Sequence, residues 1–246
     1  MRTGWSHDEV TIHECVRAAN NSGCEWVVIH GRTRAQGYEG RADWDLIAEV
    51  KQSAKIPIIG NGDIRTAQQA QALLNHFEID AVMIGRGALR NPWIFKECIG
   101  IDKDDFQSPC EVIDRYLELL RFKYDLRNTI IFLRKFASWL VYGYPGAAAF
   151  RSSMYHLFTI DELVQSARIF FERVAHLPKP KFEPSENFMA NGHGWLFIMW
   201  VNSAGNKMTN QFKQSESKRI KDTEFTLYGW NTCMQFFKNR PNDLRR

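Results

Sequence analysis

The sequence predicts an α/β fold followed by a small all-α helical bundle and a tail without an assigned fold. Strand-like and helix-like patterns alternate over the first hundred residues, which is typical of a parallel sheet with right-handed crossovers. Two short apolar runs, 56–59 and 81–84, end directly in loops that contain glycine. Apolar runs of this length indicate parallel strands covered on both faces.

Each element of this alternation follows from a local pattern. Ser6, with Glu9 three residues later, is the predicted N-cap of a first helix over residues 7–20. A buried strand over 26–30 comes next, and a helix over 44–53 follows it. A helix rich in Ala, Gln and Leu, 66–77, then separates the two glycine-flanked strands. The predicted order is helix, strand, helix, strand, helix, strand.

The loops after the two apolar runs, 60–64 and 85–88, are suited to binding an anion. Their glycines let backbone N–H groups approach a ligand closely, and Arg86 adds a forked positive charge. A (β/α)8 barrel often binds phosphate with the loops after its last two strands, so a phosphorylated cofactor is indicated. Neither loop is a dinucleotide-binding or Walker A fingerprint, which disfavours Rossmann and P-loop folds. The alternative is that the glycines form ordinary turns and Arg86 is a surface residue.

Five motifs together resemble the tRNA-dihydrouridine synthase family. They are Ile29-His30-Gly31-Arg32-Thr33-Arg34, Gln36-Gly37-Tyr38-Glu39-Gly40-Arg41-Ala42-Asp43-Trp44, Gly60-Asn61-Gly62-Asp63-Ile64, Gly85-Arg86-Gly87-Ala88 and Asn91-Pro92-Trp93-Ile94-Phe95. The resemblance runs from about Arg2 to about Val174. It implies FMN-dependent reduction of uridine to 5,6-dihydrouridine in tRNA, with NADPH as the reductant. It also implies two regions: the C-terminal portion of a TIM (β/α)8 barrel over 1–105 and a helical tRNA-binding domain over 106–177. The resemblance does not cover residues 178–246, where Pro178-Lys179-Pro180-Lys181 indicates a linker and the rest is an unassigned basic tail.

The resemblance also assigns roles to residues at the strand ends. It implies that the FMN phosphate and ribityl chain are held by Asn61, Gly62, Asp63, Gly85 and Arg86. A carboxylate would repel phosphate. Asp63 is therefore expected to accept a hydrogen bond from a ribityl hydroxyl or to cap the following helix.

Three further residues come from the loop after the first strand. The resemblance places His30 beside the flavin and the substrate base, and the alternative is a histidine satisfied within the strand-end network. Arg32 and Arg34 are candidates for contacts to substrate phosphate or base, and their alternative is a solvated loop. Both interpretations stay open at this point.

Two features of the family's chemistry are missing from these 246 residues. The general acid is a cysteine in an Asn-x-Gly-Cys-Pro segment, and no such segment occurs. Cys24 lies in a superficially similar run but precedes the strand over 26–30, at the barrel end away from the chemistry, so it is predicted to be partly buried and not catalytic. A flavin-contacting lysine, expected just ahead of Met1, is the second missing feature.

The resemblance therefore predicts barrel strands six to eight alone. Such a portion would leave two sheet edges unpaired and one barrel-facing surface exposed. The polypeptide by itself is then expected to be inactive. Met1 is a true start, a mis-called start or a fragment boundary, and the residues alone do not choose among the three.

The second region shows helical patterns over 112–123, 130–142, 147–157 and 161–174, and Thr159 with Glu162 is a predicted capping box. By resemblance this bundle grips tRNA, with phosphate contacts from Arg134, Lys135 and Arg151. Most relatives have histidine where Phe136 stands, which puts that contact in doubt. The alternative for the three basic residues is a solvated helix face.

Composition sets the remaining expectations. Residues 178–246 hold 11 Lys and Arg against 6 Asp and Glu, so the basicity of the chain belongs to its tail, which could add nonspecific RNA affinity. This tail is either a small added domain or the product of a shifted or read-through frame. No apolar run is long enough to span a bilayer and no signal peptide is visible, so no membrane association is expected. Five scattered cysteines suit a reducing cytoplasm and lack metal-ligand spacing, so no metal is predicted.

Three functional hypotheses remain. The leading hypothesis is a portion of an FMN-dependent tRNA-dihydrouridine synthase, a monomer if its barrel were complete. The second is a noncatalytic RNA-binding remnant. The third is another FMN-dependent barrel oxidoreductase, and the segment 38–44 argues against it.

Overall fold

The computed structural model describes residues 1–101, 106–180 and 199–202. These residues form two compact units. Unit 1 holds residues 1–88, 93–101 and 199–202, and unit 2 holds residues 89–92 and 106–180. Of the tail predicted from residue 178 onward, 181–198 and 203–246 lie outside the described residues. No helix in the described part of the chain is long and apolar enough to cross a membrane.

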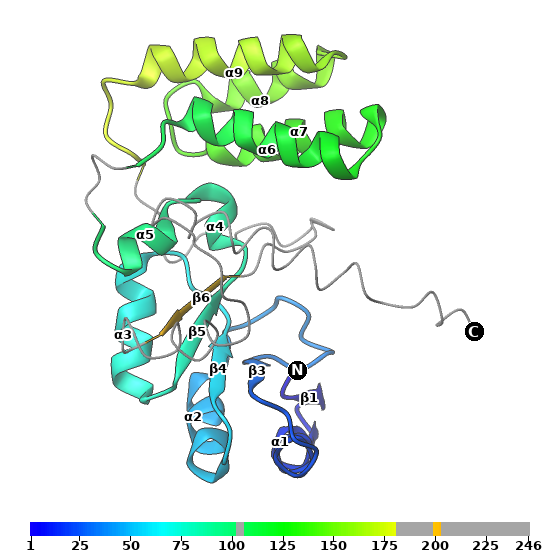
Figure 1. Cartoon of the computed structure of the whole chain (residues 1–246), viewed down its shortest axis with the longest axis vertical. Coiled ribbons are helices and arrows are strands. Elements are labelled where there is room, and N and C mark those ends of the chain that lie inside the picture. Colours follow the sequence, from blue (N-terminus) through cyan, green and yellow to red (C-terminus); the bar gives the residue numbers. More distant parts are fainter. Residues whose placement is uncertain (102–105, 181–198, 203–246) are drawn as a thin grey trace, which may run out of the picture. The chain divides into compact units, whose positions relative to one another are not determined.

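Four strands lie side by side in the sheet of unit 1, in the order β3-β4-β5-β6 (Figure 1). Their bounds are Val27–His30 for β3, Ile58–Asn61 for β4, Ala81–Ile84 for β5 and Met199–Asn202 for β6. The first three strands are parallel to one another, as predicted, and β6 is antiparallel to β5. The α/β prediction is therefore confirmed, while the barrel stays a prediction.

Three helices share one apolar core with this sheet: α1 Ile12–Asn21, α2 Trp44–Ser53 and α3 Ala67–Phe77. The predicted bounds of α2 and α3 are confirmed to within one residue. Asp43 caps α2 by accepting from the N–H of Leu46, and Thr66 caps α3 in a capping box with Gln69. Two short helices follow the sheet, α4 Gly87–Arg90 and α5 Ile94–Cys98.

The predicted first helix was wrong in its first turn. Residues of that turn form a small antiparallel hairpin instead, between β1 Gly4–Ser6 and β2 Glu9–Val10, and α1 begins only at Ile12. The backbone of β1 also accepts hydrogen bonds from the N–H groups of Arg34 and Ala35. These long-range bonds outweigh the local capping signal of Ser6 and Glu9.

The expectation of two unpaired edges and an exposed barrel-facing surface is contradicted in part by the described residues. At one edge, β6 pairs with all of β5. At the other edge, Arg2 forms a parallel bridge with His30, and the N–H of His30 donates to the carbonyl of Met1 at 2.8 Å. The sheet face turned away from the helices is buried at Ile59, Ala81 and Met83. Backbone pairing therefore covers the β5 edge, while the β3 edge is paired at His30.

Unit 2 is helical, and four α-helices and a 3-10 turn form it: α6 Pro109–Lys123, α7 Leu126–Leu140, α8 Ala147–Ser153, η2 Met154–His156 and α9 Ile160–Val174. The predicted capping box of Thr159 and Glu162 is present at α9. Phe136 is 1% exposed and its ring lies 4.3 Å from that of Tyr116, so it belongs to the core between α6 and α7. An ion pair of 2.6 Å between Arg168 and Asp114 joins α9 to α6.

Candidate functional site

The carboxyl ends of β3, β4 and β5 lie next to one another, because the three strands are parallel and in register. His30 ends β3 opposite Asn61 at the end of β4, and Asn61 in turn pairs with Met83 of β5. Side chains repeat this order: His30 Nδ1 lies 2.6 Å from Asn61 Oδ1, and Asn61 Nδ2 donates to the Met83 carbonyl at 2.7 Å. In parallel α/β sheets this end is where ligands bind.

His30 is a largely buried, neutral histidine. Burial lowers its pKa from 6.5 to about 4, against the hydrogen bond to Asn61, which raises it. The charges of Arg2 and Arg32 lower the pKa further, and Asp63 raises it. Within the described residues, Nε2 of His30 is buried without a hydrogen-bond partner. At neutral pH the ring therefore carries one proton and has one nitrogen available to a ligand.

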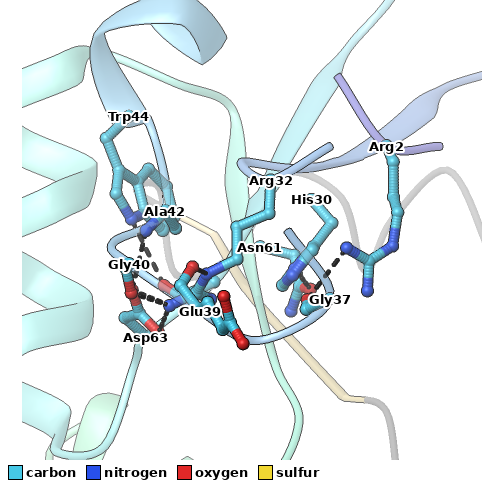
Figure 2. A network of polar contacts seen from close by, with 11 residues as sticks. Arg2, His30, Arg32, Gly37, Glu39, Gly40, Ala42, Trp44, Asn61 and Asp63 are labelled. Carbon is cyan, nitrogen blue, oxygen red and sulfur yellow. Dashed lines mark hydrogen bonds and ion pairs between the residues drawn. The ribbon is translucent and has the colours of Figure 1, made fainter. Parts of the chain in front are cut away.

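Arg32 is 3% exposed and holds the loop after β3 onto the loop after β4 (Figure 2). Its Nη2 donates to both carboxylate oxygens of Asp63, at 2.8 and 2.9 Å, and to the Gly40 carbonyl at 2.7 Å. Its Nε donates to the Glu39 carbonyl at 3.0 Å. The buried guanidinium therefore fixes the positions of the two loops. A contact of Arg32 with substrate stays a prediction, and its Nη1 is buried without a partner among the described residues.

Asp63 is the acceptor at the centre of this network, and it does not cap the following helix, because Thr66 does. Burial alone would raise its pKa, but hydrogen bonds from the Ala42 N–H and from Arg32 lower it overall, so it is ionised. Its backbone has a φ of +56°, which asparagine and aspartate tolerate better than other residues with a Cβ. The expected ribityl contact of Asp63 stays a prediction.

Gly62 has a conformation and surroundings that exclude a side chain. Its φ is +136°, and a Cβ there would lie 2.4 Å from the Cβ of Ala42. The Gly62 carbonyl accepts from the indole Nε1 of Trp44 at 3.2 Å. The loop after β4 is therefore held against the loop after β3 with no room for a larger residue at position 62.

Arg86 follows β5, and its guanidinium lies 4.1 Å from the centre of the Tyr38 ring. Burial lowers its pKa, and the charges acting on it include Arg32, Arg65 and Asp63. These groups amount to more positive than negative charge, which suits an anionic ligand. The neighbouring Gly85 is half-buried. Arg34, by contrast, is exposed, and the structure gives its side chain no hydrogen bond or ion pair within unit 1.

Sequence reasoning missed Arg2, which fixes the far end of the same loop. Its Nη1 donates to the carbonyls of Thr33 and Gly37, at 2.6 and 3.0 Å (Figure 2). A lone arginine before a hairpin gives no local signal for this role. Cys24, predicted to be partly buried, is exposed instead, because it lies in the turn after α1.

The basic residues predicted in unit 2 have three different environments. Arg134 donates from Nη2 to the Leu157 carbonyl at 2.5 Å, and Lys135 is exposed. Arg151 lies 5.4 Å from the ring of Tyr142, and Arg90 lies 3.4 Å from the same ring. The sequence analysis overlooked Arg90 and Tyr142. The tRNA contacts predicted for Arg134, Lys135 and Arg151 stay predictions.

No three His, Cys, Asp or Glu side chains gather in the described ranges in a way that could hold a metal ion. The fold and the site thus define an α/β protein with polar loops at the carboxyl ends of parallel strands. A family model described as dihydrouridine synthase (Dus) matches residues 1–175, so the chain belongs to the dihydrouridine synthase family.

Several curated relatives are similar to the chain. A tRNA-dihydrouridine synthase B of Pasteurella multocida is 36% identical over 160 residues, which cover 62% of this chain and 48% of the relative. A probable tRNA-dihydrouridine synthase of Rhizobium leguminosarum is 38% identical over 150 residues, covering 61% and 47%. A tRNA-dihydrouridine synthase B of Pseudomonas aeruginosa is 32% identical over 178 residues, covering 70% and 54%. The chain spans about half the length of these relatives.

Proposed function

We propose that these residues are the cofactor-holding and RNA-holding part of an FMN-dependent tRNA-dihydrouridine synthase, which reduces uridine to 5,6-dihydrouridine with NADPH in the cytoplasm. Family membership and the names of the relatives support the reaction. The observation that carries the proposal is the joining of three parallel strand ends into one polar site, with a half-buried Arg86 and an available nitrogen on His30. This site would belong to the last three strands of a TIM barrel.

The residues present fit an FMN molecule. Arg86 would bind the phosphate with its forked guanidinium, and the backbone N–H groups around Gly62 and Gly85 would add further donors. A Cβ at position 62 would clash with Ala42 and so disturb the loop that carries these donors. Reduced FMN, when bound, supplies the hydride. The hydrogen bond between Asn61 and His30 would fix the polar groups at the ends of β3 and β4.

His30 is not suited to be the general acid of this reaction. With a pKa lowered to about 4 by burial, its ring is neutral at physiological pH and holds its single proton on the nitrogen that faces Asn61. The proton for the uracil carbon must come from another group. This agrees with a cysteine acid in the family's Asn-x-Gly-Cys-Pro segment, which these 246 residues do not contain.

We propose that unit 2 contacts tRNA through basic side chains that lie outside its core. Lys135 on α7 is exposed and Arg151 on α8 is partly exposed, so both can reach phosphate oxygens. Arg134 is engaged with the Leu157 carbonyl, so its predicted effect on tRNA affinity is smaller. Contacts of this kind weaken steeply with salt.

The test is a fluorescence titration of FMN with the full 246-residue chain and its Arg86→Ala variant. Loss of a charge-assisted contact is expected to weaken binding by roughly 1.5–3 kcal/mol, or about 10- to 100-fold in Kd. Arg86→Lys, which keeps the charge and loses the fork, is expected to lie between the two. Arg34→Ala, in an exposed residue, is the matched control and should bind FMN as the parent does. Equal affinity of the parent and Arg86→Ala would contradict the assignment.

Two other functions give different results in the same samples. A noncatalytic RNA-binding remnant is favoured by tRNA binding without any FMN binding, and it draws on the exposed Lys135. Another FMN-dependent oxidoreductase would bind FMN without tRNA. Measuring both ligands therefore separates the three hypotheses.

A further inference from the structure

The side-chain amide of Asn61 has a fixed orientation. The Met83 carbonyl can only accept a hydrogen bond, and Asn61 places an amide nitrogen 2.7 Å from it. The NH₂ end of the amide must therefore face Met83. Consequently the Oδ1 end faces His30, at 2.6 Å from Nδ1.

This orientation determines which nitrogen of His30 carries the proton. Asn61 Oδ1 has no proton to give, so the short contact requires a proton on His30 Nδ1. A neutral imidazole carries one N–H proton, and in His30 that proton is donated to Asn61 Oδ1. Nε2 is left as a bare lone pair, and among the described residues it is buried and unpartnered.

We propose that Asn61 is a positioning residue that holds His30 in the Nδ1–H tautomer, so that Nε2 accepts a hydrogen bond from an N–H or O–H group of the bound ligand. A fully ionised phosphate oxygen has no proton to donate and is excluded from this position. The ligand's phosphate is therefore directed to Arg86, and a donor such as the imide N–H shared by isoalloxazine and uracil is directed to His30. The identity of these ligands rests on the proposed function, whereas the tautomer does not.

The charges around the ring agree with a neutral histidine. Arg2 and Arg32 face it and oppose protonation, and the single carboxylate that acts on it, Asp63, is already paired with Arg32. Burial makes the largest contribution to lowering the pKa of His30. The ring thus stays in one tautomer throughout the neutral range.

The experiment is ¹⁵N NMR of the full chain with labelled histidine at pH 7, with His30 assigned through His30→Gln. A pyrrole-type Nδ1 and a pyridine-type Nε2 are expected for His30. His7, exposed on the same chain, is an internal control and should show mainly the Nε2–H form typical of free imidazole. A pyrrole-type Nε2 in His30 would overturn the proposal.

Two substitutions test the role of Asn61. Asn61→Leu removes the acceptor and should return His30 to the Nε2–H form, while Asn61→Asp keeps an acceptor and should keep the Nδ1–H form with a raised pKa. Asn20→Leu, at the end of α1, is the matched control and should change nothing at His30. An unchanged tautomer in Asn61→Leu would overturn the role. If that variant fails to fold, the response of Asn61→Asp decides, and a fall or no change in the pKa of His30 counts against the proposal.

Ligand titration tests the acceptor. FMN or uridine 5′-monophosphate should shift the Nε2 resonance of His30, and sulfate, an anion without a proton at pH 7, should not. FMN that binds by fluorescence without shifting Nε2 would overturn the donor requirement. A complete lack of FMN binding would instead refute the proposed function, while the tautomer measurement still decides the role of Asn61.

Discussion

Arg32→Ala is expected to destabilise unit 1 by about 3 kcal/mol, because it removes the buried cation that holds two loops together. The guanidinium makes four hydrogen bonds, two to the Asp63 carboxylate and one each to the Glu39 and Gly40 carbonyls. Breaking a buried ion pair from one side typically costs about 3–5 kcal/mol. The lower end applies here, because the Asp63 side chain is 29% exposed and water can replace part of what it loses.

The measurement is urea unfolding monitored by hydrogen exchange of peptides that cover β3 and β4, which reports on unit 1 alone. Arg34→Ala is the matched control, since it removes the same side chain two residues along from an exposed position, and it should stay within about 0.5 kcal/mol of the parent.

Asp63→Asn completes a double-mutant cycle. Each single variant leaves a buried or half-buried partner without its counter-charge, so the double variant Arg32→Ala/Asp63→Asn should cost clearly less than the sum of the two single losses. Additive losses, or an Arg32→Ala variant as stable as Arg34→Ala, would refute the reasoning that this pair organises the site.

Three further predictions concern acidity, the sheet edge and catalysis. Because the pKa of His30 is lowered from 6.5 to about 4, the folded chain binds fewer protons than the unfolded chain between these values. Its free energy of unfolding should therefore fall by up to about 3 kcal/mol as pH drops from 6.5 to 4, and denaturation of His30→Gln should lack this component. Val201→Pro should speed hydrogen exchange of β5 amides, because proline cannot donate within β6 and restricts its backbone. The 246 residues, incubated with FMN, NADPH and unmodified tRNA, should yield no dihydrouridine by mass spectrometry, because losing a general acid alone costs about two to four orders of magnitude; product that disappears in Cys24→Ala would contradict this.

Much of unit 1 could be predicted because its signals are local. The strands β3 to β5 are short apolar runs ended by polar or glycine residues, and α2 begins at Trp44 after a capping aspartate. The hairpin of β1 and β2 was missed for the opposite reason. Its stability comes from backbone bonds to Arg34 and Ala35, about thirty residues away, and no local pattern reports such pairing.

The sequence predicted which residues belong to the candidate site, but it did not predict the hydrogen bonds that join them. The motifs identified His30, Asn61 and Asp63 one by one as candidates for ligand contacts, with a strand-end network as the alternative for His30 and a helix cap as the alternative for Asp63. The structure joins them to protein groups first: Asn61 to His30 and Met83, and Asp63 to Arg32. Which polar atoms are used within the protein depends on distances between strands, and these distances are set only when the strands pair.

These internal connections determine what the site can present to a ligand. A hydrogen bond between two groups of the protein uses one donor and one acceptor site and fixes the direction of both partners. Asn61 donates one amide N–H to the Met83 carbonyl and accepts from His30 Nδ1 with its Oδ1. His30 therefore has one acceptor, Nε2, in a known direction. Arg32 makes three of its hydrogen bonds to the Gly40 carbonyl and the Asp63 carboxylate, and these bonds hold the loops after β3 and β4 together, while Arg86 adds a positive charge nearby. An acceptor on His30 and a cation on Arg86 together favour a ligand that carries both a hydrogen-bond donor and an anion, and a flavin mononucleotide has both.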